Sequence, residues 1–280
     1  MSTLTLPNIA SQIRRDIVRM VHGASSGHPG GSLGCVEVLT LLFFEEMKIN
    51  PDTFDMDGIG EDLFFLSNGH ISPVWYSILA RRGYFPVNEL ATFRKINSRL
   101  QGHPATEEGL PGIRIASGSL GQGLSAAIGA AQVKKLNAEE TTVFSLHGDG
   151  ELQEGQIWEA AMYAAHHKVD NLISFVDCNG QQIDGPTDEV MGLGDLAQKW
   201  TAFGWRVHVC DGHDFDALRA AVTTSREARG SGVPQVVLMK TAMGKGVDFM
   251  EGTHEWHGIA PNDDQLASAL GQLDETLGDY

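Results

Sequence analysis

Residues 143–185 decide the fold, and their sequence is VFSLHGDGELQEGQIWEAAMYAAHHKVDNLISFVDCNGQQIDG. An apolar run at 142–146 has the length and composition of a buried strand. Residues 154–167 follow with helical spacing, and the apolar stripe of this helix is predicted to be Trp158, Ala161, Met162 and Ala165. A second apolar run at 172–176 completes a strand–helix–strand unit, whose two strands we expect to pair in parallel.

The same alternation continues through the rest of the chain. Residues 62–66, 205–209 and 234–240 resemble buried strands, and residues 73–82 and 214–226 resemble helices. The sequence therefore predicts an α/β fold: a mostly parallel sheet flanked by helices on both faces.

Two oxygen-bearing side chains follow the strands of the central unit. Asp149, between Gly148 and Gly150, comes directly after the first strand, and Asn179 follows the second. Parallel strands end at the same edge of a sheet, where open α/β folds bind ligands. A carboxylate and an amide oxygen suit Mg²⁺ or Ca²⁺ better than Zn²⁺, and phosphate oxygens commonly complete the shell of Mg²⁺. The flanking glycines and the start of the next helix favour an anion at this place.

A glycine–aspartate–glycine turn is a weak signal alone, because a strand-to-helix turn capped by Asp149 would look the same. The longer pattern GDGxxQEGxxWEA, followed by DxN and IDG, is more specific. It resembles the diphosphate-binding motif of thiamine diphosphate enzymes, and most closely that of transketolases. The resemblance implies that Asp149, Asn179 and the main-chain carbonyl of Gln181 bind Mg²⁺, for which Ca²⁺ or Mn²⁺ can substitute. It also implies that Glu154 and Glu159 lie in an acidic link between paired active sites.

Four histidine-bearing segments also resemble transketolase motifs. They are SGHPGGSLG at 26–34, LSNGH at 66–70, GHP at 102–104 and HGIAP at 257–261. The glycines and proline of the first segment argue against helix or strand there. The resemblance implies that the four histidines contact substrate or cofactor and act in catalysis, and a histidine that titrates near neutrality suits proton transfer. These residues are His28, His70, His103 and His257.

Residues 118–123, GSLGQG, precede a predicted helix at 124–136. The glycine spacing does not meet the dinucleotide-binding pattern. In transketolases the corresponding segment packs along the cofactor, and Ser119 stands where that family usually has proline. The resemblance thus implies these cofactor-binding residues: His70, Gly118, Ser119, Leu120, Gly148, Asp149, Gly150, Glu154, Asn179 and His257.

The composition narrows the class of protein further. The chain has 280 residues, of which 42% are hydrophobic and 8% aromatic, and we predict a single α/β domain over 1–280. Lysine and arginine number 20 against 36 aspartates and glutamates, and the net charge of −16 argues against a nucleic-acid partner. No apolar run has the length of a membrane span. Three cysteines without metal spacing, and no signal-peptide pattern, predict a cytoplasmic protein.

The resemblance covers the diphosphate-binding half of a full-length transketolase. The pyrimidine-binding half normally supplies the glutamate that activates the cofactor, and the chain offers no candidate for it. We therefore expect an N-terminal subunit that needs a partner chain carrying the pyrimidine-binding domain, in an α2β2 heterotetramer. The resemblance implies transfer of a two-carbon ketol (glycolaldehyde) unit from a ketose or its phosphate to an aldose or its phosphate. The pathway is either the pentose phosphate route or a dedicated route for modified sugars.

Three other functions remain open from the sequence. The alpha subunit of a 2-oxo acid dehydrogenase shares the cation-binding unit and the need for a partner, but it lacks the histidine motifs. A fragment of a 1-deoxyxylulose-phosphate synthase would normally belong to one long chain. A regulatory protein that keeps the fold and binds a nucleotide would have little reason to retain Asp149, Asn179 and the four histidines together.

Overall fold

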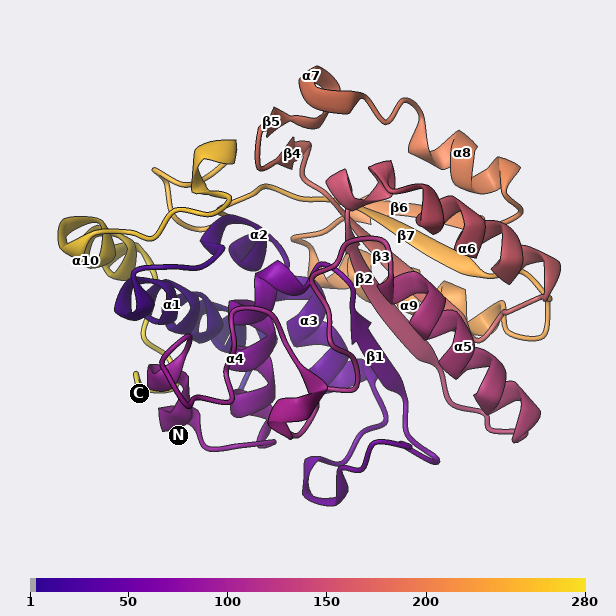
Figure 1. The fold of residues 1–280 in the computed structure, drawn as a ribbon, viewed down its shortest axis with the longest axis horizontal. Coiled ribbons are helices and arrows are strands. Elements are labelled where there is room, and N and C mark those ends of the chain that lie inside the picture. The colour runs from indigo at the N-terminus through magenta and orange to yellow at the C-terminus, as the bar shows by residue number, and fades with distance from the viewer. Residues whose placement is uncertain (1–3) are drawn as a thin grey trace.

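The structure, a computed structural model, describes residues 4–280. A five-stranded parallel sheet with strand order β1–β2–β3–β7–β6 forms its centre (Figure 1). The predicted parallel pairing of the two strands of the central unit is confirmed, since β2 and β3 align from Val143 opposite Leu172 to Gly148 opposite Asp177. The strands are β1 Leu63–Leu66, β2 Val143–Gly148, β3 Leu172–Cys178, β6 Arg206–Asp211 and β7 Gln235–Lys240.

Helices cover both faces of the sheet, as predicted (Figure 1). Alternate residues of a strand point to opposite faces, so Phe64 and Leu66 join one hydrophobic core while Leu63 and Phe65 join the other. The first core is closed by α1 Leu6–Ala24, α3 Val36–Leu41, α4 Ser72–Arg82, α9 Phe215–Glu227 and α10 Asp263–Gln272. The second is closed by α5 Gly123–Leu136, α6 Gly155–His166 and α8 Leu196–Ala202.

Shorter elements connect these layers. After β3 the chain forms a small antiparallel ribbon and helix α7 beyond the edge of the sheet (Figure 1). These elements are β4 Gln181–Gln182, β5 Gly185–Pro186 and α7 Thr187–Met191. A π-helical turn, η1 Leu42–Glu46, extends α3, and the short 3₁₀ segments are η2 Pro51–Thr53, η3 Gly69–Ile71, η4 Val87–Thr92, η5 Thr106–Glu108, η6 Gly150–Gln153 and η7 His254–Trp256. None of the helices within residues 4–280 is long and apolar enough to cross a membrane.

The glycine-rich segment 26–34 is partly helical, contrary to expectation. Pro29–Gly34 forms the short helix α2, in which proline occupies the first turn and needs no N–H partner. A Cβ atom at Gly30 would lie 2.6 Å from Cγ of Met243 and 2.8 Å from the carbonyl oxygen of Trp256. The glycine therefore permits close packing of α2 against the C-terminal loop, which composition alone did not indicate.

The buried face of α6 also differs from the predicted stripe. Met162 is 59% exposed, and Trp158 and Ala165 are only half-buried. The alanines on several faces of this helix leave its apolar periodicity ambiguous. Packing against α5 and the second hydrophobic core selects the buried face. The residues that are buried are Ile157, Ala160, Ala161 and Ala164.

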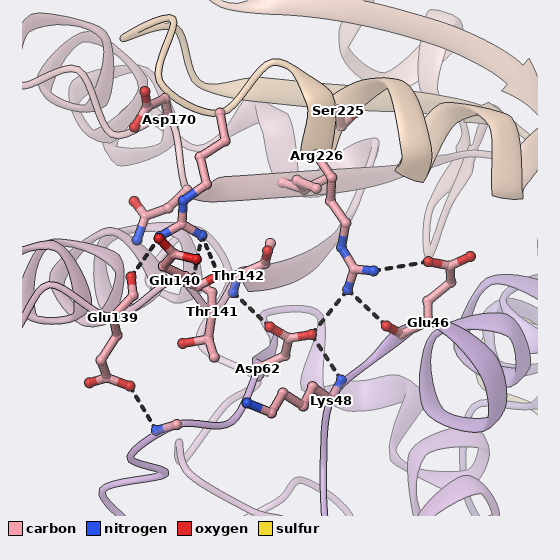
Figure 2. Close-up of a pocket in the computed structure, with 14 residues that line it drawn as sticks. Glu46, Lys48, Asp62, Glu139, Glu140, Thr141, Thr142, Asp170, Ser225 and Arg226 are labelled. Carbon is pink, nitrogen blue, oxygen red and sulfur yellow. Dashed lines mark hydrogen bonds and ion pairs between the residues drawn. The ribbon is translucent and has the colours of Figure 1, made fainter.

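A hollow of about 500 Å³ lies at the amino ends of the strands (Figure 2). Asp62 accepts hydrogen bonds there from the main-chain N–H groups of Lys48 and Thr142, and pairs with Arg226 at 3.0 Å. Arg226 also pairs with Glu46 at 3.1 Å. Because Asp62, Arg226 and Glu46 pair with one another, we assign this network to joining α9 to the sheet.

Candidate active site

A second hollow, of about 330 Å³, opens at the carboxyl ends of β1, β2 and β3. The loop after each strand contributes a polar side chain to it: Asn68 after β1, Asp149 after β2 and Asn179 after β3. This edge is where the sequence predicts the ligand. This hollow is smaller than the one at the amino ends of the strands. Its polar side chains lie together, and they do not neutralise one another in ion pairs.

Asp149 and the Asn179 loop are held together directly. The buried Asp149 carboxylate accepts a hydrogen bond from the N–H of Gly150 at 2.7 Å and another from the N–H of Gly180 at 2.7 Å. The amide of Asn179 donates to Asp177 at 2.7 Å, and its oxygen accepts from the N–H of Gln181 at 2.9 Å. Asp177 thereby fixes the orientation of the Asn179 amide, as outer-shell partners of metal ligands do.

The donor set fits a hard divalent cation. Burial and the neighbouring Asp177 raise the pKa of Asp149 to about 7, and burial also raises the pKa of Asp177. A cation placed between such groups would favour their charged forms. Within residues 4–280 no three His, Cys, Asp or Glu side chains are grouped to hold a metal ion by themselves. A mixed shell with amide, carbonyl and external oxygens, as Mg²⁺ takes, is therefore the arrangement that the predicted ligands Asp149, Asn179 and Gln181 allow.

The four predicted histidines form one cluster, although they come from four separate segments. The ring centroid of His28 lies 5.1 Å from that of His70, 6.2 Å from His103 and 5.6 Å from His257. The rings of His70 and His257 stack with centroids 5.1 Å apart. The distances between these histidines cannot be read from the sequence. Their convergence in the structure is therefore the strongest geometric support for a shared role. That role stays a prediction.

The pKa of each of these histidines is lowered from its ordinary value in this structure, which disfavours the protonated form. Burial, with repulsion from His257, Arg94 and His103, lowers the pKa of His28 to about 4. Burial and the neighbouring rings also lower the pKa of His70. Burial is the largest cause of the lowered pKa of His103 and of His257. The cluster is therefore neutral at pH 7 and offers ring nitrogens both as acceptors and as donors.

Folding stability is expected to fall in acid because of this cluster. Between pH 6.5 and about 4 the unfolded chain binds a proton at His28 that the folded chain does not. The stability is therefore complete above pH 6.5 and is lost as the pH falls toward 4. Thermal unfolding midpoints across this range test the expectation. Glutamine does not titrate, so in His28→Gln the unfolding midpoint should fall less steeply as the pH decreases. A fall as steep as that of wild type would contradict the assignment of this effect to His28.

Sequence reasoning missed the role of Glu151, which joins the loops of the site. Glu151 is 2% exposed, and its carboxylate accepts hydrogen bonds from the N–H of Gly121 at 2.8 Å, the N–H of Gly148 at 3.2 Å and the hydroxyl of Ser67. Burial alone would raise the pKa of Glu151, but His147, the Ser67 hydroxyl and the N–H of Gly121 together lower it. The only sequence signal was an acidic residue directly after the glycine–aspartate–glycine turn.

The remaining predicted cofactor contacts fall partly on the hollow. Ser119 does not line it, and its hydroxyl accepts from the side chain of Gln122 at 2.9 Å. Glu159 is exposed on α6 and lines a separate hollow beside Tyr163. The other predicted cofactor contacts all line the site hollow: His70, Gly118, Leu120, Gly148, Asp149, Gly150, Glu154, Asn179 and His257.

The fold and the site together define an α/β domain with a polar hollow at the carboxyl edge of its parallel sheet. The family model described as transketolase, thiamine diphosphate binding domain, matches residues 7–275. The chain belongs to the transketolase family of transferases.

Relatives of two lengths match this chain. A 6-deoxy-6-sulfo-D-fructose transketolase subunit from Clostridium sp. is 39% identical over 97% of this chain and 97% of its own length. An apulose-4-phosphate transketolase subunit from Actinobacillus succinogenes is 39% identical over 94% of each. The solved transketolase from Campylobacter jejuni superposes with a TM-score of 0.88 at 32% identity, covering 96% of this chain but 42% of that one.

Proposed function

We propose that this chain is the N-terminal, diphosphate-binding subunit of a two-chain transketolase. The observation that carries the proposal is its match along almost the full length of relatives named as subunits, against about two fifths of full-length transketolases. In this proposal residues 1–280 form a single diphosphate-binding domain, and a partner chain supplies the pyrimidine-binding domain. The assembly is an α2β2 heterotetramer in the cytoplasm, where the three free cysteines stay reduced.

The proposed reaction transfers a two-carbon ketol unit from a ketose to an aldose. Of the two pathways that the sequence leaves open, the names of the relatives favour a dedicated route for modified sugars over the pentose phosphate route. Both named sugars carry an acidic group, a sulfonate in one and a phosphate in the other. The proposed substrates are therefore anionic sugars.

The residues of this chain would hold the cofactor by its diphosphate. Asp149, Asn179 and the carbonyl of Gln181 would bind Mg²⁺, which neutralises the diphosphate charge. Gly148 leaves room for the anion, because even a Cβ atom there would meet no atom closer than 3.8 Å. When bound, thiamine diphosphate supplies the carbon centre that carries the ketol unit.

The histidine cluster would position and deprotonate the sugar. Neutral rings accept and donate hydrogen bonds to hydroxyl groups without bringing charge into the pocket. Separations of 5.1–6.2 Å between the ring centroids of His28, His70, His103 and His257 allow several to reach one substrate. Proton transfer by groups of this kind contributes about 10²–10⁴-fold to rate.

His103→Ala is expected to lower the turnover of the reconstituted complex by at least about 100-fold, the small end of the contribution from a positioned acid or base. Steady-state kinetics with a ketose donor and an aldose acceptor measures this. The matched control is His167→Ala, which removes an exposed histidine at the end of α6. Turnover that is unchanged in His103→Ala would remove this residue from the catalytic group.

The proposal as a whole is tested by reconstitution with the pyrimidine-binding chain encoded nearest to this one. Ketol transfer between sugars, dependent on thiamine diphosphate and Mg²⁺, is the expected result. Oxidation of a 2-oxo acid with a lipoyl acceptor, and no reaction with ketoses, would instead favour a 2-oxo acid dehydrogenase. Failure of the complex to bind thiamine diphosphate would favour a non-catalytic protein.

A further inference from the structure

Asn68 has a buried side-chain amide that makes no hydrogen bond to the residues that the structure describes. It follows β1 and is 1% exposed. Its Oδ1 is buried without a hydrogen-bond partner within residues 4–280, and its Nδ2 makes no hydrogen bond there either. Removing an amide from water without replacing its hydrogen bonds is unfavourable. A free amide at this depth therefore calls for a partner that the chain itself does not supply.

Three other asparagine and glutamine side chains are buried in the described part of the chain, and each of them donates a hydrogen bond. Asn171 donates to a main-chain carbonyl oxygen at 2.8 Å, and Gln235 donates to another at 2.6 Å. Gln12 donates to the carboxylate of Asp279 at 2.9 Å. Asn68 differs from these three in a second respect, because its residue lines the site hollow and theirs do not.

The free amide borders the space beside Gly148. If Gly148 carried a Cβ atom, Nδ2 of Asn68 would lie 3.8 Å from it. Apart from the chain neighbours of Gly148, it would be the only described atom within 4 Å. Asp149, which is the next residue and a ligand of the proposed cation, lines the same hollow. The space that Gly148 leaves for an anion therefore has an amide donor at its border.

The main chain fixes the Asn68 amide in this place. The carbonyl oxygen of Asn68 accepts a hydrogen bond from the N–H of Ile71 at 3.0 Å. A Cβ atom at Gly69 would lie 2.5 Å from the hydroxyl oxygen of Ser117, so this turn packs closely against the next loop. The hydroxyl of Ser67 accepts from the first N–H of α5 at 3.1 Å. A donor held in position before its ligand arrives loses little conformational freedom on binding.

A diphosphate in this hollow needs hydrogen-bond donors as well as a cation. The lining includes the carboxylates of Asp149, Glu151, Glu154 and Asp177, and residues 4–280 contribute no lysine or arginine to it. A divalent cation would offset part of the resulting repulsion. The amide of Asn68 is neutral and carries two N–H donors, so it attracts an anion without requiring a counter-charge of its own.

We propose that Asn68 donates a hydrogen bond from Nδ2 to a diphosphate oxygen of the cofactor. The inference rests on the proposed function and adds a binding residue to it, since the LSNGH segment assigns a role to His70 alone. Hydrogen bonds from amides to charged oxygens are stronger than those between neutral groups. The loop after β1 would thus hold the diphosphate directly, while the loops after β2 and β3 hold it through the cation.

The test is calorimetric titration of thiamine diphosphate into the complex with the partner chain at saturating Mg²⁺. Asn68→Ala should raise Kd by about 10- to 100-fold, the loss typical of a hydrogen bond to a charged group. Asn68→Asp keeps the shape of the side chain but replaces the donor by a negative charge, so it should raise Kd further. Inorganic pyrophosphate with Mg²⁺ is the second probe. Its Kd should rise by a similar factor, because it shares only the diphosphate with the cofactor.

The matched control is Asn88→Asp, which makes the same change of charge at an exposed position of η4 and should bind as wild type does. If Asn68 only supported the fold of its turn, Asn68→Asp would be milder than Asn68→Ala, because it keeps the shape. That order, an unchanged Kd in both variants, or a loss confined to thiamine diphosphate would overturn the inference. If circular dichroism shows that Asn68→Ala does not fold, Asn68→Asp against the control decides. A wild-type complex that binds no thiamine diphosphate would instead refute the proposed function.

Discussion

The chain on its own is expected to show no ketol transfer, and activity is expected to appear only when the partner chain is added. Cofactor activation requires a carboxylate against the pyrimidine ring. The buried carboxylates of this site are already engaged: Asp149, Glu151 and Asp177 accept hydrogen bonds from the loops they hold. Losing the activating acid alone should cost at least about 10²–10⁴-fold in rate.

Titrating the partner into a fixed concentration of this chain, with saturating cofactor and Mg²⁺, measures the effect. Activity should rise from background and saturate when the two chains reach equal concentrations. The control is the partner chain alone, which should be equally inactive. Full ketol transfer by this chain in a purified assay would contradict the two-chain proposal.

Asp149→Asn is expected to weaken the binding of thiamine diphosphate in the presence of Mg²⁺ by at least about 100-fold. The change removes the charged oxygen donor of the proposed cation site while keeping the shape of the side chain. Changes to outer-shell partners of metal sites already cost about 10–100-fold, and loss of a charged ligand should cost no less. Calorimetric titration of the cofactor into the complex measures the affinity.

The matched control for this change is Asp188→Asn, which removes an exposed carboxylate from α7, on the segment that follows the Asn179 loop. It should bind the cofactor as wild type does. Circular dichroism of both variants separates a lost site from a lost fold. Wild-type affinity in Asp149→Asn would exclude this carboxylate as a cation ligand.

The parts of the fold that could be predicted from sequence are those with strong periodicity. The parallel pairing of β2 with β3 follows from a strand–helix–strand pattern, and it places Asp149 and Asn179 at one edge. Such features depend on neighbours along the chain, which are visible in the sequence itself.

The features that sequence reasoning missed depend on neighbours in space. Helix α2 packs closely against the C-terminal loop because Gly30 can approach Met243 and Trp256, which lie more than 200 positions away. The low pKa of His28 arises from burial and from rings on other loops. The network around Glu151 likewise appears only when separate segments are brought together.

The central claim is that one oxygen-lined site at the carboxyl edge of the sheet binds the cation that holds the cofactor. A crystal structure of the two-chain complex with thiamine diphosphate and Mn²⁺, collected at an energy where manganese scatters anomalously, tests it most directly. We expect a single anomalous peak per active site in contact with the carboxylate of Asp149, the amide oxygen of Asn179 and the carbonyl of Gln181. A bound cofactor with the peak elsewhere, or with no peak, would contradict the claim.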